Sequence, residues 1–263
     1  RTRFEQDPDD LRSNQFGAWL AQIVYERVVA KLRNEPVEDI RIDFEDGYGN
    51  RSDHEEDAEA LRSAKEVAKA MAHDALPPFV GIRIKQLNEE HKNRAVRTLD
   101  LFLSTLVKET GGAIPSTFLI TLPKVTIPEQ VSCLVGLLDI LETRLNLAPK
   151  TLKVELMIEV TQTIFDSQGR SNIPLLIEQC DGRCFSAHFG TYDYTASCAV
   201  TAAYQTMDHS ACDFAKHMML NTLSGTGVFV SDGATNIMPV GPHRLPNAGE
   251  LNKALQNENR QAI

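Results

Sequence analysis

Short apolar runs alternate along this chain with longer amphipathic segments. The apolar runs are nearly continuous rather than alternating with polar positions, and they begin near residues 39, 79, 117, 152, 184 and 225. Such runs are typical of strands in parallel sheets, where both faces of the sheet are covered. Each interval between runs is long enough for one crossover helix, so the pattern predicts parallel strands joined by helices.

The segments between the predicted strands repeat apolar residues with a helical period. Residues 8–33 open with Asp-Pro-Asp-Asp, which suits a helix N-terminus, and then carry an apolar stripe from Leu11 to Leu32. The same periodicity predicts helices over residues 54–74, 88–109, 128–146, 171–180 and 195–222, the last long enough for two helices.

A length of 263 residues fits one large domain and the usual size of a barrel of eight strand–helix units. We therefore predict an α/β fold, a TIM (β/α)8 barrel, built as a single domain from residues 1–263. Six strands are visible, so either the first strand or the C-terminal segment of the barrel is missing from this chain, or the sheet is open. Residues 247–263 are polar and predict a helical tail rather than an eighth strand.

The predicted strands end in polar or charged groups. In a parallel sheet or barrel the carboxyl ends of the strands share one face, where ligands bind. The pattern therefore gathers at one mouth the side chains of Asp43, Glu45, Asp46, Arg83, Lys124, Glu159, His188 and Asp193. Carboxylates from three strands and a guanidinium from a fourth suit a hard divalent cation and an anionic substrate.

Glu159 and Asp193 are the predicted metal ligands. Each follows a hydrophobic run, and they lie one strand–helix unit apart, so neighbouring strands would place them side by side. Two carboxylates with water and substrate oxygens are the usual way in which proteins hold Mg²⁺. The alternative is that each carboxylate caps the helix that follows it, where the helix dipole favours negative charge.

Arg83 lies inside an apolar strand, where a guanidinium must be paired or face a cavity. It could clamp a substrate carboxylate or stabilise an enolate oxygen, or it could form a structural ion pair with Asp43, Glu45 or Asp46. Asp43 and Glu45 share one face of a strand, and like charges so close require a cation or a proton. They are also candidates for a base that acts through water; a metal-bound water and a group from a partner subunit are the alternatives.

Two further groups have competing interpretations. Lys124 could form a Schiff base, but a lysine beside several carboxylates favours a charged, hydrogen-bonded role. His188 could be a base or a ligand, and a satisfied core histidine is the alternative. Four basic residues are candidates for binding coenzyme A, with a solvated helix face as the alternative: Lys85, Lys92, Arg94 and Arg97.

The composition restricts the partners. A net charge of −9 gives no general attraction to nucleic acid or anionic membranes, and no apolar run approaches the roughly 18 residues that span a bilayer. Five cysteines, an odd number, argue against a complete disulfide framework and favour reduced thiols in a cytoplasmic protein. We expect a small anionic substrate, no nucleic acid and no membrane.

Five short motifs, in this order, resemble the HpcH/HpaI aldolase and citrate lyase beta-subunit family. They stand here as Asp43-Phe-Glu-Asp46, Ile82-Arg-Ile-Lys85, Leu122-Pro-Lys124, Ile158-Glu-Val160 and Gly190-Thr-Tyr-Asp193. The resemblance covers about residues 38–240 and implies a barrel of the phosphoenolpyruvate/pyruvate type. Lys85 and Val160 replace the asparagine and threonine usual in the family, which places this chain in a divergent, citrate-lyase-like branch.

The resemblance also implies an activity. Mg²⁺ would be held by Glu159 and Asp193, Arg83 would bind the substrate, and Lys124, Gly190 and Thr191 would line the substrate site. The implied enzyme is a Mg-dependent carbon–carbon lyase (aldolase or citrate-lyase-like), a homotrimer or hexamer, that cleaves a 2-hydroxy acid or its acyl-CoA thioester through an enolate. The alternatives are an acyl-CoA thioesterase on the same metal site and a non-catalytic metabolite-binding subunit.

Overall fold

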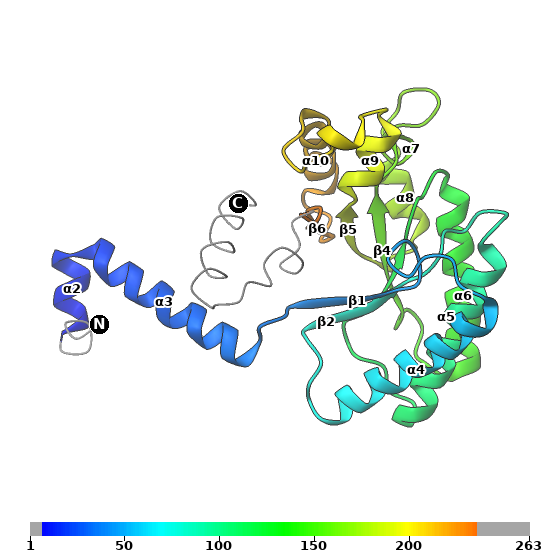
Figure 1. Ribbon diagram of the computed structural model, residues 1–263, viewed down its shortest axis with the longest axis horizontal. Coiled ribbons are helices and arrows are strands. Elements are labelled where there is room, and N and C mark those ends of the chain that lie inside the picture. The colour runs from blue at the N-terminus through cyan, green and yellow to red at the C-terminus, as the bar shows by residue number, and fades with distance from the viewer. Residues whose placement is uncertain (1–6, 236–263) are drawn as a thin grey trace, which may run out of the picture.

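Six parallel strands form one sheet in which each strand pairs with the next along the chain (Figure 1). The computed structural model describes residues 7–235, so the predicted tail over 247–263 and any strand beyond residue 245 lie outside the described residues. The strands are β1 (Asp39–Asp43), β2 (Phe79–Arg83), β3 (Phe118–Leu122), β4 (Lys153–Ile158), β5 (Cys184–Phe189) and β6 (Phe229–Ser231). This order is that of part of a TIM barrel, and residues 7–235 do not close it.

The first five strands begin within one residue of their predicted positions, and the sixth does not. β6 begins at Phe229 rather than near residue 225 and holds only three residues. Gly225 and Gly227, with φ of 76° and 81°, form a left-handed turn before it. Extended strands do not adopt this backbone conformation, so the strand begins only after the turn.

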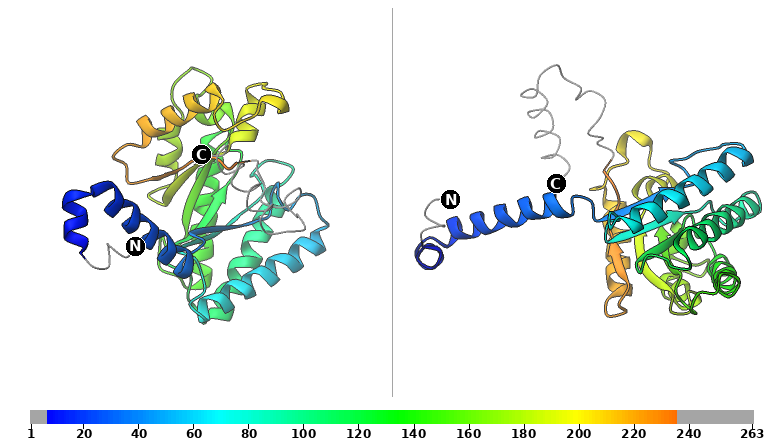
Figure 2. Two further views of the ribbon diagram at one scale, coloured as in Figure 1. Left: turned by 60° about the vertical axis from the view of Figure 1, so that its left-hand side comes forward. Right: turned by 90° about the horizontal axis from the view of Figure 1, so that it is seen from below.

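Helices cover one face of the sheet, which we call the outer face (Figure 2). Local signals mark the starts of two of them: α4 has a capping box at Ser52, and α6 has Pro128 in its first turn. The segment 195–222 divides, as its length allowed. The bounds are α4 (Asp53–Ala72), α5 (Lys92–Thr110), α6 (Pro128–Leu145), α7 (Thr161–Ile164), α8 (Ile173–Gln179), α9 (Thr191–Ser197), η1 (Ala202–Tyr204) and α10 (Ser210–Leu223).

The two faces of the sheet differ in chemistry. On the outer face Ile42, Ile82 and Ile120 are partners on adjacent strands and pack in one hydrophobic core with the helices. The inner face carries a polar row in register across five strands, formed by Asp43, Arg83, Thr121, Glu155 and Ser186. The prediction of apolar strands covered on both faces is therefore right for the outer face and wrong for the inner one.

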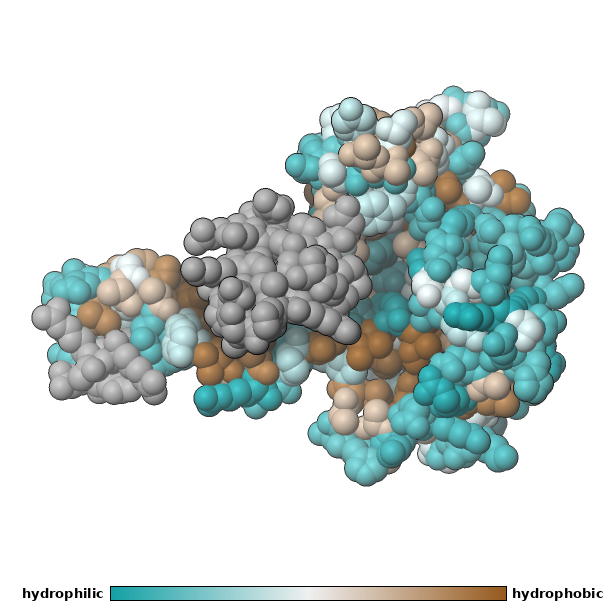
Figure 3. All heavy atoms as spheres, viewed as in Figure 1, coloured by the Kyte–Doolittle hydropathy of each residue, from teal (hydrophilic) through white to brown (hydrophobic). Residues whose placement is uncertain are grey.

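The N-terminal segment forms two helices rather than the one predicted, α2 (Pro8–Asn14) and α3 (Phe16–Asn34). They project from the sheet in both views of Figure 2. None of the α3 residues is buried, and the apolar stripe lies at the surface (Figure 3). Within residues 7–235 no helix is both long and apolar enough to cross a membrane.

Candidate functional site

The polar ends of β1 to β5 meet at one edge of the sheet, as the strand pattern predicts. A cavity of about 300 Å³ opens there, and we call it the mouth cavity. Its lining includes Asp46 from the first loop, Arg83 from β2, Glu159 after β4, and His188 and Asp193 from the β5 segment. Both predicted metal ligands therefore face the same space as the predicted substrate-binding arginine.

Arg83 is held at this edge by Asp43. Its Nε donates to Asp43 Oδ1 at 2.7 Å, and its Nη2 donates to Asp43 Oδ2, so the pair is bidentate. The Asp43 carboxylate also accepts from the backbone N–H groups of Glu45 at 2.9 Å and Gly47 at 2.7 Å. Burial would raise the pKa of Asp43, but these four donors outweigh it and the pKa is lowered.

Gly47 is required for this arrangement. A Cβ atom at position 47 would lie 2.4 Å from Asp43 Oδ2, closer than any real contact. The glycine therefore lets the loop fold over the Asp43 carboxylate. With its donors in place, Asp43 fixes the direction in which Arg83 points. The structural ion pair considered from the sequence is formed, and Arg83 still reaches the cavity.

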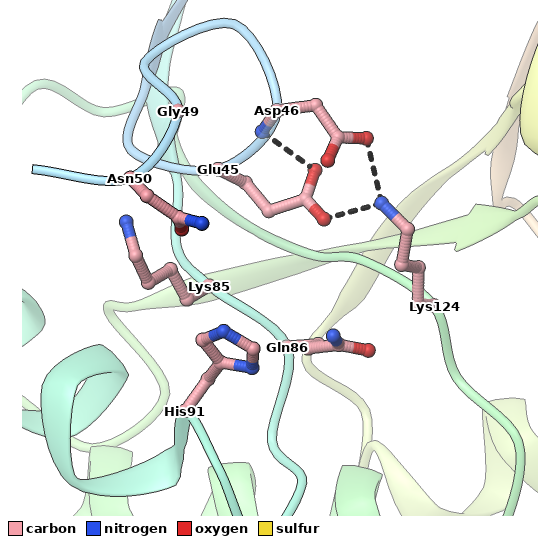
Figure 4. Close-up of a pocket in the computed structure, with 8 residues that line it drawn as sticks. All are labelled: Glu45, Asp46, Gly49, Asn50, Lys85, Gln86, His91 and Lys124. Carbon is pink, nitrogen blue, oxygen red and sulfur yellow. Dashed lines mark hydrogen bonds and ion pairs between the residues drawn. The ribbon is translucent and has the colours of Figure 1, made fainter.

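Lys124 lies at the centre of the acidic groups. Its Nζ donates to Glu45 Oε1 and, at 2.6 Å, to Asp46 Oδ2 (Figure 4). It also lies 3.1 Å from Asp193 Oδ2. Burial alone would lower the pKa of Lys124, but the hydrogen bonds to Asp46 and Glu45 raise it. A Schiff-base lysine must lose its proton, so this environment favours the charged, hydrogen-bonded role.

The backbone of Lys124 has a separate function. Its φ of 49° lies in the left-handed region, which is rare for a residue with a side chain. In this conformation the Lys124 N–H donates to Glu159 Oε1 at 2.7 Å. Strained backbone of this kind is typical of functional sites. The Leu-Pro-Lys motif therefore positions a carboxylate as well as supplying a cation.

Glu159 is almost completely buried and accepts that single backbone hydrogen bond in the described part of the chain. Burial is the largest influence on it, and the nearby charges of Asp193 and Glu45 act in the same direction. Together they raise the pKa of Glu159 to about 7. A buried carboxylate with one donor and acidic neighbours is an environment that a cation would relieve.

Gly190 gives Glu159 its space. A Cβ atom at position 190 would lie 2.5 Å from Glu159 Cβ and 2.7 Å from its Oε2. Thr191, the next residue, is buried, and its Oγ1 has no hydrogen-bond partner within residues 7–235. Both residues line the mouth cavity, as their predicted place in the substrate site requires.

The donor set fits Mg²⁺. Glu159 and Asp193 supply two carboxylates, and Mg²⁺ is usually held by one or two carboxylates with waters and substrate oxygens. Among the described residues no group of three or more His, Cys, Asp or Glu could hold a metal ion. Other oxygens would therefore have to complete the coordination, which leaves room for a chelating substrate.

A second cavity of about 290 Å³ lies next to the mouth cavity, and its lining includes Glu45 and Asp46 (Figure 4). Asp46 lines both. Burial raises the pKa of Glu45 despite its bond to Lys124, whereas for Asp46 the Lys124 bond outweighs burial and lowers the pKa. The second cavity is also lined by Lys85, Gln86 and His91.

The four basic candidates for coenzyme A binding are all paired with carboxylates. Lys85 Nζ lies 2.8 Å from Glu56 Oε2, and Lys92 Nζ lies 2.7 Å from Glu89 Oε1. Arg94 and Arg97 both contact Asp57. These four positive charges are therefore balanced by carboxylates of the protein itself.

Sequence reasoning missed one polar network on the inner face. Arg41 binds both oxygens of Glu155 at 3.1 Å, and the same carboxylate accepts from the hydroxyl groups of Thr121 at 2.7 Å and Ser186 at 2.6 Å. The available signal was the period of two along the strands, which places Arg41 on the face of Asp43 and Glu155 on the face of Glu159.

The sequence matches a family described as a domain of unknown function, DUF6986, over residues 3–262. The chain belongs to this family. No curated protein matches this DUF6986 chain.

Solved structures similar to this DUF6986 chain include a citrate lyase from Burkholderia xenovorans LB400. The TM-score is 0.57 and the identity 18%, and the match covers 91% of this chain and 67% of that one. A malate synthase from Haloferax volcanii, studied with glyoxylate, gives a TM-score of 0.56 at 18% identity, covering 75% of this chain and 54% of that one. The same enzyme in a pyruvate and acetyl-CoA ternary complex gives 0.50 at 17%, covering 67% and 46%.

At these identities the similarity concerns the fold. It supports the resemblance to the citrate lyase type of barrel at that level, and it agrees with a parallel α/β sheet that forms part of a TIM barrel. The chain spans about half the length of the malate synthase structures.

Proposed function

We propose that this protein is a Mg-dependent carbon–carbon lyase that cleaves a 2-hydroxy acid or its acyl-CoA thioester through an enolate. The observation that carries the proposal is Glu159, a buried carboxylate with one hydrogen-bond donor, which faces the mouth cavity beside Asp193 and Arg83. Citrate lyase and malate synthase, the proteins with similar folds, also act on small acids by their names.

Glu159 and Asp193 would hold Mg²⁺. A bound Mg²⁺ would supply a fixed positive charge that orients an acid substrate and stabilises negative charge as it develops. The raised pKa of Glu159 supports this assignment, because a cation at the site would relieve the repulsion from Asp193 and Glu45.

Arg83 would bind the substrate's carboxylate or carbonyl. Asp43 occupies its Nε and Nη2, while Nη1 lies 3.5 Å from Glu45 Oε2 and 3.6 Å from Met157 Sδ. The guanidinium is therefore oriented before any substrate arrives, which is the preorganisation that stabilises an enolate oxygen. Lys124 would neutralise the surrounding acids, and Gly190 and Thr191 would shape the wall.

Asp43 and Glu45 were the predicted bases, and this role stays a prediction. Asp43 already accepts four hydrogen bonds, and Glu45 is paired with Lys124 and Arg83. These contacts favour a role in positioning for both carboxylates.

The test incubates the chain with Mg²⁺ and a panel of free 2-hydroxy acids and hydroxyacyl-CoA thioesters, and identifies the products. We expect an oxo acid or a carbonyl fragment together with an acid or acyl thioester. Free thiol with an intact carbon chain would instead support the thioesterase, and tight binding without turnover would support the metabolite-binding subunit. A trimeric or hexameric assembly and a cytoplasmic location stay predictions.

Matched variants test the metal assignment within the same experiment. Glu159→Gln and Asp193→Asn each remove one charge from the mouth cavity, and we expect both to abolish Mg-dependent turnover without unfolding the chain. Asp181→Asn removes a charge from an exposed ion pair with Lys150 and should leave turnover unchanged. Normal turnover in either mouth variant would remove the metal assignment.

A further inference from the structure

His188 is a histidine of β5 whose ring belongs to the mouth cavity, together with Arg83, Glu159 and Asp193. On the sheet it is the register partner of Met157 on β4, in the row next to the polar row of the inner face. It therefore lies between the polar network of the inner face and the predicted metal ligands at the mouth.

The imidazole makes no hydrogen bond within residues 7–235. The neighbouring row shows that this strand can supply partners, because Ser186, two residues earlier, donates to Glu155 at 2.6 Å. His188 is half-buried rather than enclosed in the core, so its ring is open to a molecule in the mouth cavity. The interpretation of His188 as a satisfied core histidine is therefore not supported by its contacts.

The other titratable groups that line the mouth cavity have partners. Asp46 and Asp193 pair with Lys124, and Glu159 accepts from the Lys124 backbone. Arg83 is bound to Asp43, and the Tyr192 hydroxyl group donates to the carbonyl oxygen of Ala234 at 2.9 Å. Of the titratable side chains that the structure describes in the mouth cavity, His188 is thus the one without a hydrogen-bond partner.

The charges around His188 come from three strands. Burial is the largest influence and lowers its pKa, Glu155 and Asp39 act to raise it, and Arg41 and Arg83 act to lower it. The net effect is a lowered pKa, so the ring is neutral at pH 7 and one ring nitrogen can accept a proton.

We propose that His188 is the proton-transfer residue of the lyase reaction, an inference that rests on the proposed function. In the cleavage direction an imidazole nitrogen accepts the proton of the substrate hydroxyl group. The carbon–carbon bond breaks, its electron pair passes to the acid fragment as an enolate, and the hydroxyl-bearing carbon becomes a carbonyl. The imidazolium then returns the proton to the enolate carbon, which restores the neutral ring and leaves no net change in protons.

The experiment measures a half-reaction that needs no second substrate. Acetyl-CoA is incubated with the chain and Mg²⁺ in D₂O, because the acyl fragment is the one that becomes the enolate, and exchange of its methyl protons for deuterium is followed by NMR. We expect the wild type to exchange and His188→Gln to exchange at least about 100-fold more slowly, the smaller end of the range for a general base. His54→Gln, a change on the exposed start of α4, is the matched control and should exchange at the wild-type rate.

The outcomes separate the two proposals. Calorimetry with Mg²⁺ and oxalate, an analogue of the 2-oxo acid product, should show that His188→Gln still binds both. Exchange by His188→Gln at the wild-type rate would overturn the role of His188 and leave the lyase proposal standing. An absence of exchange in the wild type would overturn the lyase proposal and, with it, this one.

A second measurement does not depend on the variant folding. Diethyl pyrocarbonate acylates accessible neutral imidazole, and mass spectrometry locates the modified residue. We expect modification of His188 in the native chain, loss of exchange in step with it, and protection of both by Mg²⁺ with oxalate. A native chain that exchanges at full rate after His188 has been modified would refute the proposal.

Discussion

Glu155 lies in β4 and Glu159, four residues later, directly follows that strand; both are buried, with 4% and 1% of their surfaces exposed. Their ionisation nevertheless differs in direction. For Glu155, burial is outweighed by Arg41, Ser186 and Thr121, and the pKa is lowered. For Glu159, burial prevails, and the pKa is raised to about 7.

The difference lies in what surrounds each carboxylate. Glu155 accepts from a guanidinium and two hydroxyl groups, so all of its partners belong to the protein. Glu159 accepts one backbone N–H and faces the charges of Asp193 and Glu45. A buried carboxylate whose oxygens all accept hydrogen bonds from the protein stabilises the fold. A buried carboxylate with one donor and like charges beside it favours binding of a cation from solution.

The largest expected effect is the loss of stability when the hydrogen-bonded carboxylate of Glu155 is replaced. Glu155→Gln would remove the buried counter-ion of Arg41 and leave only the exposed Asp39 carboxylate. Removal of one member of a buried pair costs up to about 3–5 kcal/mol. Urea unfolding at pH 7.5 measures the free energy. Glu109→Gln, at an exposed position of α5, is the control and should unfold like the wild type. A loss as small as the control's would show that the network does not stabilise the chain.

The second prediction concerns pH. Because the pKa of Glu159 is raised in the folded state, this residue makes the fold less stable as pH rises from about 4.5 to about 7. The shift from 4.5 to about 7 corresponds to about 3 kcal/mol. Urea unfolding between pH 4.5 and 8 should show this decline in the wild type. Glu159→Gln, which cannot ionise at this position, should lose most of the decline and be the more stable protein at pH 8, while the raised pKa of Glu45 leaves a smaller decline.

The third prediction is that Mg²⁺ stabilises the folded protein. At 100 times its Kd, Mg²⁺ should stabilise the wild type by about 2.7 kcal/mol, since it binds the folded state. Thermal unfolding with and without MgCl₂ measures this. Glu159→Gln and Asp193→Asn should lose the response, and Glu109→Gln should keep it. A full response in both mouth variants would place any Mg²⁺ elsewhere.

The smallest expected effect is the loss of stability when the space beside Glu159 is filled. Gly190→Ala would press a methyl group against the Glu159 side chain, and overpacking of this kind costs about 1–3 kcal/mol. It should also weaken the Mg²⁺ response, because Glu159 must shift. Gly136→Ala, in α6 with open space around it, is the control and should be neutral or slightly stabilising. Equal behaviour of the two variants would show that Gly190 does not constrain Glu159.

Much of the secondary structure could be predicted from local sequence patterns. Apolar runs and helical periodicity located five strands and the helices, because secondary structure depends on periodicity and on turn residues that lie close in sequence. Parallel topology then placed Asp43, Arg83, Lys124, Glu159 and Asp193 at one edge, since strands of one direction end together. The turn over Gly225 and Gly227, which delays β6, was the local feature that this reasoning overlooked.

Contacts between distant segments were decided only in three dimensions. The sequence of this chain determined the fold class and which side chains share the mouth. The tertiary structure decided which hydrogen bonds these side chains form. Asp43 accepts from Arg83, Lys124 donates to Glu45 and Asp46, and Arg41 donates to Glu155. His188 lines the mouth cavity and has no hydrogen bond among the described residues. The physical reason is that the ionisation and role of a side chain depend on the number of donors within reach, and several of those donors lie 31 to 114 residues away in the sequence.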